Sequence, residues 1–587
     1  MIDHQATSSV PSVPVVPGAS DERLDCVVIG YNESPFPAYE AMLRGSGEDS
    51  LAYRDLKYSF VDFAGQPLTY VDLLNHARAR GPAPLAAAEP FRSGDPPNLA
   101  AVYLISFLRR RGLRAALVNL FQDDKDALRA LLARKPRCVA ITTTFYVLNH
   151  PLHEMIELIR GHAPDVKIIV GGPLIANHFR RHVTAELGLV LADIGADIYI
   201  HEAQGELTLS QLVACLRDGG DLRSVPNLAF FAGHRLHRTA TVPENNDLDQ
   251  VDIDWLGFRG ERLGAVLQTR TARSCAFKCA FCAYPMRAGK LTLTSLDVVR
   301  RELDAMREHG GVRVVVFIDD TFNVPLPRFK DLCRLMIERG YGFDWFSYFR
   351  CSNSDDEAID LMARAGCKGV FLGIESGSPT ILANMNKAAT LEKYQRGVVR
   401  LRDHGIATFG SFIVGFPGET EATVDETIAC IRDLRFDYYR AQLWYCEPGT
   451  PIDGMRDKYA LEGEGYAWRH RTMDSAQASA HVERVFRSID ASAWLPQWSF
   501  DFWFLPYVLG RGVSLPQFRE VMGLAHDLLR LEFDDQPAHR KLVAQHALLR
   551  RMTGAMASWQ LADRARPVVP GAAPGAVPDD EIERGEL

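Results

Sequence analysis

Apolar runs alternate with segments of helical period along the first half of the chain. Between about residues 97 and 235, segments such as PLHEMIELIRGH have the spacing of amphipathic helices. Four apolar runs predict buried strands: AALVNLF (115–121), CVAITTTFYV (138–147), VKIIVGG (166–172) and ADIYIH (196–201). Strands that alternate with helices form parallel βαβ units. The pattern therefore predicts a doubly wound α/β domain with its ligand beyond the carboxyl ends of the strands.

A second α/β series follows, and its strands start roughly 25 to 50 residues apart. Helical segments such as SLDVVRRELDAMREHG fill the gaps between them. The six predicted strands are AVLQTRT (265–271), RVVVFIDD (313–320), DWFSYFRC (344–351), GVFLGIE (369–375), TFGSFIVG (408–415) and DYYRAQLWYC (437–446). Six β/α units predict a barrel, complete or partial, whose chemistry lies where the strands end.

The remaining segments complete the predicted organisation. Both ends are rich in Pro and small residues without an apolar period, which predicts disorder. The part after the barrel is mostly helical and contains the aromatic stretch WLPQWSFDFWFLPYVLG (494–510). The predicted regions are a disordered N-terminus (1–22), an N-terminal extension (23–95), the first α/β domain (96–240), the barrel (258–460), a helical domain (461–564) and a disordered tail (565–587).

Composition narrows the functional classes. The net charge of −8 and the absence of a dense Lys/Arg run argue against a nucleic-acid surface. No run of apolar residues is long enough to predict a membrane span, and the first residues lack a signal-peptide pattern. The eleven cysteines are odd in number and mostly scattered, so a disulfide framework is not expected. We therefore expect a cytoplasmic protein that does not associate with membranes.

One cysteine group carries a chemical signal. Cys275, Cys279 and Cys282 have the spacing C-x3-C-x2-C and follow the first predicted barrel strand directly. Thiolates this close bind a soft metal or an iron–sulfur cluster. Structural zinc takes four ligands, and the nearest other cysteines, Cys215 and Cys333, are distant in sequence. A three-cysteine zinc site stays open, but a 4Fe–4S cluster with one open iron fits the triplet better.

With aromatic Phe281 before the last cysteine and β/α units after it, the triplet resembles that of the radical S-adenosylmethionine (SAM) enzymes. The resemblance implies that the open iron binds SAM and that the cluster cleaves it to a 5′-deoxyadenosyl radical. The implied SAM contacts at later strand ends are Asp319 and Asp320 for the amino group, Glu375 and Ser376 for ribose or carboxylate, Ile413 and Gly415 for adenine, and Arg350. The family's Gly-Gly-Glu is absent, so Asp319 and Asp320 can also be solvated acids. Arg350, which ends the third predicted strand, can equally be a surface charge.

The order VAITTTFYV, VKIIVGGP, ADIYIHEAQGELTL resembles the Rossmann-type domain of the cobalamin-binding class of these enzymes. The implied cobalamin contacts are Thr142, Thr143, Thr144, Gly171, Gly172, Glu202 and Gly205. None of the 17 histidines has Asp two residues before it, so no motif histidine ligates cobalt. A domain that has lost cobalamin would show the same absence. No G-x-G-x-x-G opens a helix here, which disfavours a nicotinamide site.

Three further residues are candidates for contact with a cofactor. Tyr445 is predicted to contact SAM or cobalamin. His201 and Cys446 end predicted strands, but a hydrogen-bonded histidine and a cavity-wall thiol are the simpler interpretations. The flanks 25–40, 52–75 and 498–512 resemble the P-methyltransferases of phosphinothricin-type biosynthesis and related methylases.

Together the resemblances imply a Rossmann-type cobalamin-binding domain, a partial radical SAM barrel and a helical C-terminal domain. They imply a cobalamin-dependent radical SAM methyltransferase that uses methylcobalamin, acting on carbon or phosphinate phosphorus of a natural-product intermediate. A small-molecule, peptide or carrier-bound substrate and a flavodoxin- or ferredoxin-type reductant are the expected partners. Two alternatives stay open: a radical enzyme that forms a ring or rearranges its substrate without methylation, and a cofactor-binding sensor without turnover.

Overall fold

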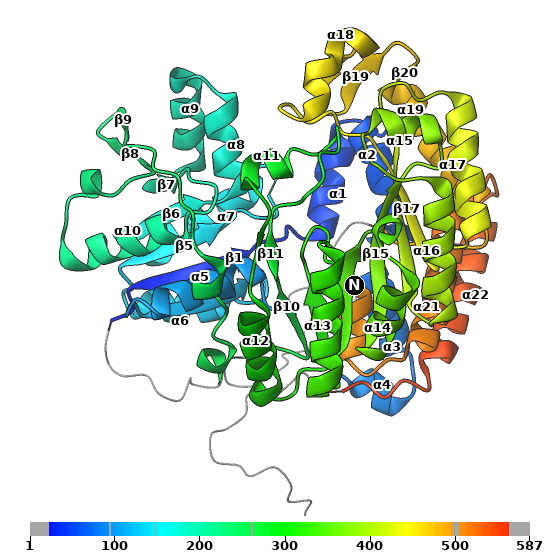
Figure 1. The fold of residues 1–587 in the computed structure, drawn as a ribbon, viewed down its shortest axis with the longest axis horizontal. Helices are drawn as coiled ribbons and strands as arrows, with labels where there is room; N and C mark the ends of the chain where they lie inside the picture. Colours follow the sequence, from blue (N-terminus) through cyan, green and yellow to red (C-terminus); the bar gives the residue numbers. More distant parts are fainter. Residues whose placement is uncertain are drawn as a thin grey trace, which may run out of the picture.

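A computed structural model describes residues 23–92, 95–146, 148–259, 261, 263–496 and 504–562. It consists of two α/β bodies side by side, the first formed mainly by the N-terminal half of the chain and the second by the barrel strands (Figure 1). The segments 1–22 and 565–587, expected to be disordered, lie outside the described residues, as do 497–503 of the aromatic stretch.

The first body is a seven-stranded sheet in the order β4-β1-β5-β6-β7-β8-β9. Its strands are β1 (Cys26–Tyr31), β4 (Ala115–Leu120), β5 (Cys138–Thr142), β6 (Lys167–Gly171), β7 (Ile198–Ile200), β8 (Leu228–Ala232) and β9 (Arg235–Arg238). The first five strands in this order are parallel, and β8 and β9 are antiparallel. The doubly wound prediction is confirmed.

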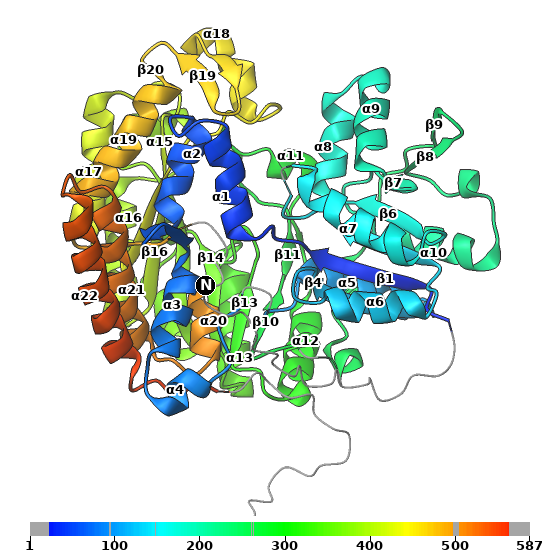
Figure 2. The same cartoon turned by 180° about the vertical axis from the view of Figure 1, so that it is seen from behind.

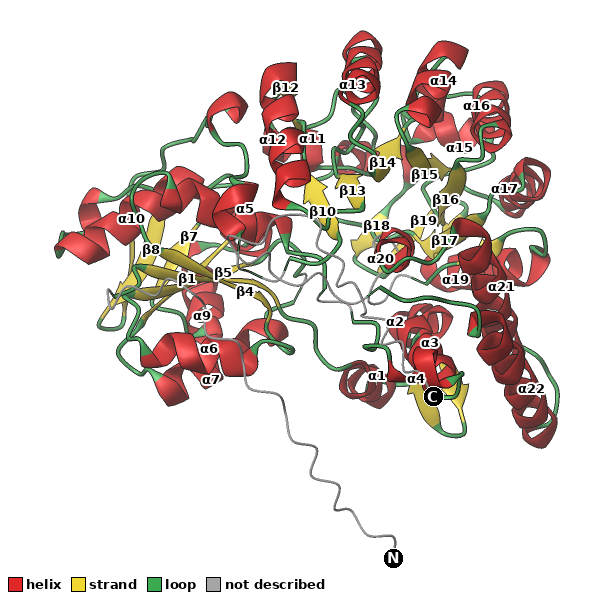
Figure 3. Cartoon of the chain, turned by 90° about the horizontal axis from the view of Figure 1, so that it is seen from below, coloured by secondary structure: helices red, strands yellow, loops and turns green. Residues whose placement is uncertain are grey.

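Helices cover both faces of this sheet (Figure 3). They are α5 (Leu99–Arg109), α6 (Lys125–Ala133), α7 (His150–His162), α8 (Pro173–Arg181), α9 (Thr184–Ile194) and α10 (Glu206–Asp218). Strand β1 comes from the segment expected to be an N-terminal extension, and it pairs with both β4 and β5. A strand with neighbours on both sides and helices on both faces is buried all round, which explains its continuous apolar run CVVIGY.

The second body is a parallel sheet in the order β10-β13-β14-β15-β16-β17-β21. The six strands expected from the sequence are β10 (Val266–Thr269), β13 (Val314–Phe317), β14 (Asp344–Phe349), β15 (Cys367–Glu375), β16 (Ala407–Val414) and β17 (Tyr438–Leu443). The seventh, β21 (Ala493–Trp494), comes from the C-terminal part. In the described residues β10 and β21 do not pair, so the barrel is partial, and α20 (Phe504–Gly510) contacts β10 and β13 at the opening.

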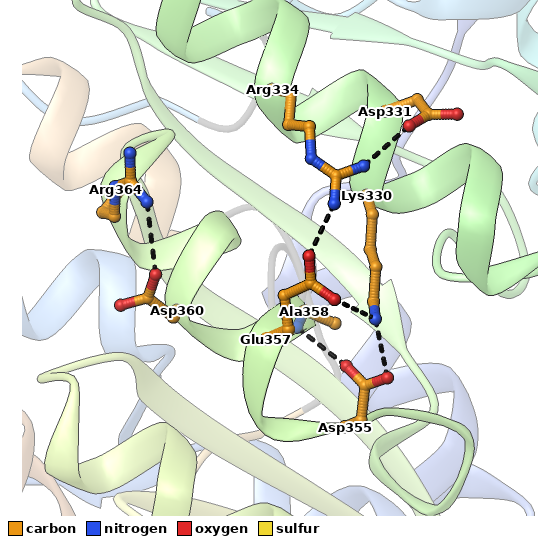
Figure 4. Close-up of polar contacts among 8 residues, drawn as sticks. All are labelled: Lys330, Asp331, Arg334, Asp355, Glu357, Ala358, Asp360 and Arg364. Carbon is orange, nitrogen blue, oxygen red and sulfur yellow. Dashed lines mark hydrogen bonds and ion pairs between the residues drawn. The ribbon is translucent and has the colours of Figure 1, made fainter.

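The barrel helices lie along the outer side of the strands (Figure 3). They are α12 (Leu296–His309), α13 (Leu326–Arg339), α14 (Asp356–Arg364), α15 (Pro379–Asn384), α16 (Leu391–Asp403) and α17 (Glu421–Leu434), whereas the short α11 (Tyr284–Ala288) follows the cysteine loop. Ion pairs join α13 to the start of α14, where Lys330 contacts Asp355 at 2.7 Å and Glu357 at 2.6 Å (Figure 4). The two acids of this network are about half exposed, so it contributes little to stability.

The segment after β1 packs against the C-terminal helices (Figure 2). Contacts join α2 to α19, β2 to α21, and α3 to α22. The bounds are α1 (Phe36–Gly45), α2 (Leu51–Leu56), β2 (Val61–Phe63), β3 (Gln66–Leu68), α3 (Tyr70–Ala79), α4 (Ala83–Ala87), α19 (Ser475–Ser488), α21 (Leu515–Glu532) and α22 (Ala538–Met556). Within the described segments, no helix has the length and apolar character needed to cross a membrane.

Trp494 joins these parts of the chain. Its ring centroid lies 5.3 Å from Tyr58, 5.3 Å from Tyr439 and 5.2 Å from Phe486. Its indole nitrogen donates a hydrogen bond to the backbone oxygen of Tyr58 at 3.1 Å. The side chain therefore bridges the N-terminal segment, barrel strand β17 and helix α19.

We expect Trp494→Ala to lower the free energy of unfolding by about 3–5 kcal/mol, because it leaves a large cavity and removes a buried hydrogen bond. Urea unfolding followed by circular dichroism measures the loss. Val543→Ala is the control, because Val543 is 68% exposed, and we expect a change within about 0.5 kcal/mol. A Trp494→Ala loss no larger than this control would contradict the bridging role.

Candidate functional site

Two adjoining cavities lie at the carboxyl ends of the two sheets. The larger, of about 770 Å³, lies at the mouth of the barrel, and the smaller, of about 540 Å³, lies between the barrel and the first sheet. They share a wall of five side chains: Phe145, Gln268, Tyr284, Asp320 and Tyr348. Ligands in the two cavities would therefore be separated only by this wall.

All three cysteines of the triplet line the larger cavity. The loop that carries them is anchored at Ala280, whose N–H donates to the oxygen of Met385 at 2.8 Å and whose oxygen accepts from Ile452 at 3.0 Å. Burial raises the pKa of the Cys282 thiol, and the nearby Cys279 and Cys275 act in the same direction. Among the described residues no three His, Cys, Asp or Glu side chains are placed to hold a single metal ion. Three thiols on one cavity wall fit the larger 4Fe–4S cluster.

The two predicted carboxylates have different surroundings. Asp319 accepts hydrogen bonds from the N–H of Thr271 at 2.7 Å, its hydroxyl at 2.9 Å and the N–H of Ala272 at 2.6 Å. These bonds hold the turn that leads from β10 to the cysteine loop, and Asp319 does not line either cavity. Asp320 lines both cavities. Burial raises its pKa to about 7, and the adjacent Asp319 adds to the shift.

Arg350 and Glu375 line the larger cavity. The guanidinium of Arg350 lies 3.6 Å from the centroid of Phe277, and one of its buried nitrogens has no partner. Glu375 has a φ of +67° at an irregularity where β15 meets β16. Its carboxylate accepts from Lys387 at 2.8 Å, and both side chains are about 90% buried. No sequence motif pointed to Lys387, because it lies in a loop after α15 and contacts Glu375 only in the folded chain.

In each of the other two predicted SAM pairs, Glu375 with Ser376 and Ile413 with Gly415, only the first residue lines the larger cavity. Ile413 lines the larger cavity. Ser376 is fully buried, and its hydroxyl lies 3.2 Å from that of Thr427. Gly415 has a φ of +97°, and a Cβ there would come within 2.6 Å of the Trp468 ring. The structure thus places Ser376 and Gly415 in internal packing behind the cavity wall, and the role of Trp468 was not visible in the sequence.

Five of the seven residues predicted to contact cobalamin line the smaller cavity: Thr142, Thr144, Gly171, Gly172 and Gly205. Strand β5 ends at Thr142, earlier than expected, and Thr143 turns inward to donate to the oxygen of Gly171 at 2.9 Å. Gly172 has a φ of +110°, and a Cβ there would lie 2.8 Å from the Thr143 hydroxyl. Glu202 instead accepts from the N–H of Glu244 at 3.4 Å and does not line the cavity.

The three further candidates lie outside both cavities. Tyr445 is 41% exposed, and its ring contacts Tyr466 at 5.1 Å. The ring of His201 stacks on Phe179 at 4.7 Å, and burial lowers its pKa to about 4. Cys446 is buried, and its sulfur lies 3.8 Å from a nitrogen of Arg456.

Comparisons with known proteins agree with this geometry. Residues 92–203 match the model of the B12 binding domain, and residues 269–431 match that of the radical SAM superfamily. The uncharacterized methyltransferase PH0819 of Pyrococcus horikoshii is 26% identical over 367 residues, which cover 61% of this chain and 77% of that protein. The anaerobic magnesium-protoporphyrin IX monomethyl ester cyclase of Rubrivivax gelatinosus is 26% identical over 371 residues, which cover 59% of this chain and 63% of the cyclase.

Two solved structures share the fold. The radical SAM methyltransferase TsrM from Kitasatospora setae, with cobalamin and a 4Fe–4S cluster bound, is 17% identical at a TM-score of 0.56, covering 79% of this chain and 97% of TsrM. The cobalamin-dependent SAM radical enzyme OxsB, with aqua-cobalamin bound, is 16% identical at a TM-score of 0.53, covering 78% of this chain and 73% of OxsB.

The chain therefore contains a B12-binding domain followed by a radical SAM domain. Its cofactors are a 4Fe–4S cluster, SAM and cobalamin. The thiols, the glycine-lined wall and the orphaned Arg350 nitrogen fit these groups.

We expect Lys387→Met to lower the free energy of unfolding by about 3–5 kcal/mol, because it leaves the buried carboxylate of Glu375 without a counter-charge. The double variant Glu375→Gln/Lys387→Met removes both charges, so it should recover most of the loss. Urea unfolding without SAM measures both variants. A double variant as unstable as the single one would contradict this explanation.

Glu302 is a buried acid beneath the site. It accepts from Thr269 at 2.6 Å and from the indole of Trp255 at 3.2 Å, and burial raises its pKa from 4.5 to about 7. The Glu302 carboxyl therefore holds its proton more tightly in the folded chain than in the unfolded chain. Its contribution to the free energy of unfolding falls as pH rises from 4.5 to about 7, and it does not change further above pH 7.

Glu302→Gln removes this titration and keeps an oxygen acceptor. Relative to the native chain, we expect the variant to gain stability between about pH 5 and 8, by up to about 3 kcal/mol. Urea unfolding of both chains at pH 5 and pH 8 measures this difference in stability. The titration of the other acids is common to both chains and cancels when the two are compared. A variant whose relative stability does not change with pH would contradict the raised pKa.

Proposed function

We propose that this chain is a cobalamin-dependent radical SAM methyltransferase that transfers a methyl group to an unactivated carbon or a phosphinate phosphorus of a natural-product intermediate. The observation that carries the proposal is the wall shared by the two cavities. A cysteine-lined cavity and a glycine-lined cavity meet at Asp320, Tyr284 and Tyr348. A substrate held at this wall would lie within reach of groups bound on either side.

Each group has a set of residues that would hold it. Cys275, Cys279 and Cys282 would hold the cluster. Asp320, Arg350, Glu375 and Ile413 would contact SAM, and Thr142, Thr144, Gly171, Gly172 and Gly205 would contact cobalamin. When bound, the cluster with SAM supplies a carbon-centred radical, and cobalamin supplies the methyl group.

The chain's own contribution is a largely aromatic chamber between these sets. The ring of Phe145 contacts Tyr31 at 5.4 Å, Tyr348 contacts Phe371 at 5.9 Å, and Phe371 contacts Phe409 at 5.2 Å. These rings would exclude water from a reactive substrate, while Gln268, Ser411 and Gln442 on the barrel strands offer hydrogen bonds that orient it. The chamber suits a small molecule, or one group of a peptide or carrier-bound substrate.

Two further parts of the proposal concern the surroundings of the enzyme. The cluster needs an external electron donor, for which we propose a flavodoxin- or ferredoxin-type protein. We also propose that the enzyme works in the cytoplasm, without nucleic-acid or membrane partners. Phosphinates of the phosphinothricin type are the first acceptors to test, because the flanks resemble P-methyltransferases.

The first test is the metal content of the chain, purified without oxygen after expression with cobalamin. We expect about four iron atoms and one cobalt per chain. Cys279→Ala should lose most of the iron and keep cobalt, because the two groups have separate ligands. Cys215→Ala, on α10 outside both cavities, is the matched control and should retain both metals. Iron without cobalt in the native chain would refute the cobalamin part.

The second test is product stoichiometry under reducing conditions. Methyl transfer from two SAM molecules gives S-adenosylhomocysteine and 5′-deoxyadenosine in about equal amounts, measured by mass spectrometry. Deoxyadenosine without S-adenosylhomocysteine would favour ring formation or rearrangement. Cofactor binding without any SAM cleavage would favour a sensor.

A further inference from the structure

Three polar side chains at the smaller cavity have buried hydrogen-bond donors without partners. They are the hydroxyl of Tyr103 and one terminal nitrogen each of Arg270 and Arg273. All three residues line this cavity. A buried donor without an acceptor costs free energy, so three around one space indicate that a ligand supplies the acceptors.

Arg273, on β11 (Ala272–Arg273), is the most buried of the three, with 5% of its surface exposed. One terminal nitrogen donates to the backbone oxygen of Asn246 at 3.1 Å, which fixes the guanidinium. The other terminal nitrogen has no partner. The bond to Asn246 therefore leaves one charged donor of this cavity-lining residue without an acceptor.

Arg270 and Tyr103 lie together beside it. The guanidinium carbon of Arg270 lies 4.3 Å from the centroid of Tyr103, which holds the two side chains in contact. Burial raises the pKa of Tyr103 to about 12, so its hydroxyl keeps its proton and can donate. The nearest acid is Glu206, 3.8 Å from the Arg270 nitrogen and too far for a hydrogen bond. Glu206 is itself engaged, because it accepts from the Asn246 amide at 3.0 Å.

The other residues that line the cavity restrict the chemical class of its ligand. Arg180 and Arg287 also line it, so the positive side chains outnumber its two acids, Glu206 and Asp320. An apolar part of the wall lies alongside, formed by Leu99, Leu104, Ala140, Ile169 and Leu209. A negatively charged group attached to an apolar ring would satisfy both parts. Planar guanidinium forks match the paired oxygens of phosphate-type groups.

We propose that Tyr103, Arg270 and Arg273 form an oxyanion subsite that binds a phosphate-type group in the smaller cavity. The group can come from the phosphodiester of the cobalamin nucleotide loop or from a phosphorus oxyanion of the substrate. The first source rests on the cobalamin binding proposed above. The subsite joins Arg270, which follows barrel strand β10, and Arg273 on β11 to helix α5 of the first body, so its ligand would also hold the two bodies together.

The test compares two corrinoids on chain purified without cobalamin. Cobinamide has the corrin ring but lacks the nucleotide loop and its phosphodiester. Dissociation constants come from titrations followed by visible absorption. With the phosphodiester as the source, Arg273→Leu should weaken cobalamin binding about tenfold or more and change cobinamide binding less than about twofold. Arg273→Lys should recover part of the loss, because it keeps a charged donor.

Two variants guard against trivial explanations. Tyr103→Phe removes only the hydroxyl and keeps the packing, so it tests the subsite even if Arg273→Leu does not fold. It should weaken cobalamin binding several-fold. Arg259→Leu is the matched arginine control, because Arg259 pairs with Glu308 on the surface and lines neither cavity. It should leave both dissociation constants unchanged.

The second source is tested with inorganic phosphate on the cobalamin-loaded chain, by calorimetry. Phosphate binding that Arg273→Leu abolishes, with unchanged cobalamin affinity, assigns the subsite to the substrate. Equal weakening of both corrinoids, or no change in cobalamin and phosphate binding, would overturn the subsite. A native chain that binds neither corrinoid would refute the proposed function instead, and phosphate titration of the cofactor-free chain would then decide the subsite alone.

Discussion

The structure depends on one constraint, which is that parallel strands place all their carboxyl ends at the same edge of the sheet. In each body the strands run in one direction, so the loops that carry chemistry gather at one edge. The cysteine loop follows β10, and the threonine and glycine loops follow β5 and β6. These loops form a joint site only because the two edges face each other, which the wall of Asp320, Tyr284 and Tyr348 demonstrates.

The segment between the two sheets that includes Asp252, Asp254, Trp255 and Glu261, called the linker here, maintains this arrangement. Arg109 at the end of α5 pairs with Glu261 at 2.8 Å, and Arg110 pairs with Asp252 at 3.0 Å. The backbone N–H of Asp254 donates to the hydroxyl of Ser106 at 3.2 Å. The same linker reaches the barrel, because its Trp255 bonds to Glu302. The linker is therefore attached to a helix of each body, which restricts the angle between the two sheets.

Polar groups at the site fall into two kinds. Asp319 accepts three hydrogen bonds within the chain, so it holds the turn before the cysteine loop in place. Arg273 and Arg350 keep buried donors without partners. The first kind fixes geometry before any ligand arrives, and the second offers binding energy to the ligand. Whether a buried polar group already has a partner therefore distinguishes supporting residues from binding residues, which residue type alone cannot do.

The sequence by itself determined the elements and the chemistry that depend on local spacing. Apolar runs and helical periods identified the strands of both sheets except β1, β8, β9 and the two-residue β21, and three close cysteines indicated a cluster, because both signals lie within short segments. The tertiary structure decided which of two adjacent residues faces the cavity, as with Asp320 rather than Asp319 and Thr142 rather than Thr143. It also placed β1 in the first sheet and brought Lys387 to Glu375. These outcomes depend on strand order and on how loops pack, which are set by contacts between residues far apart in the chain.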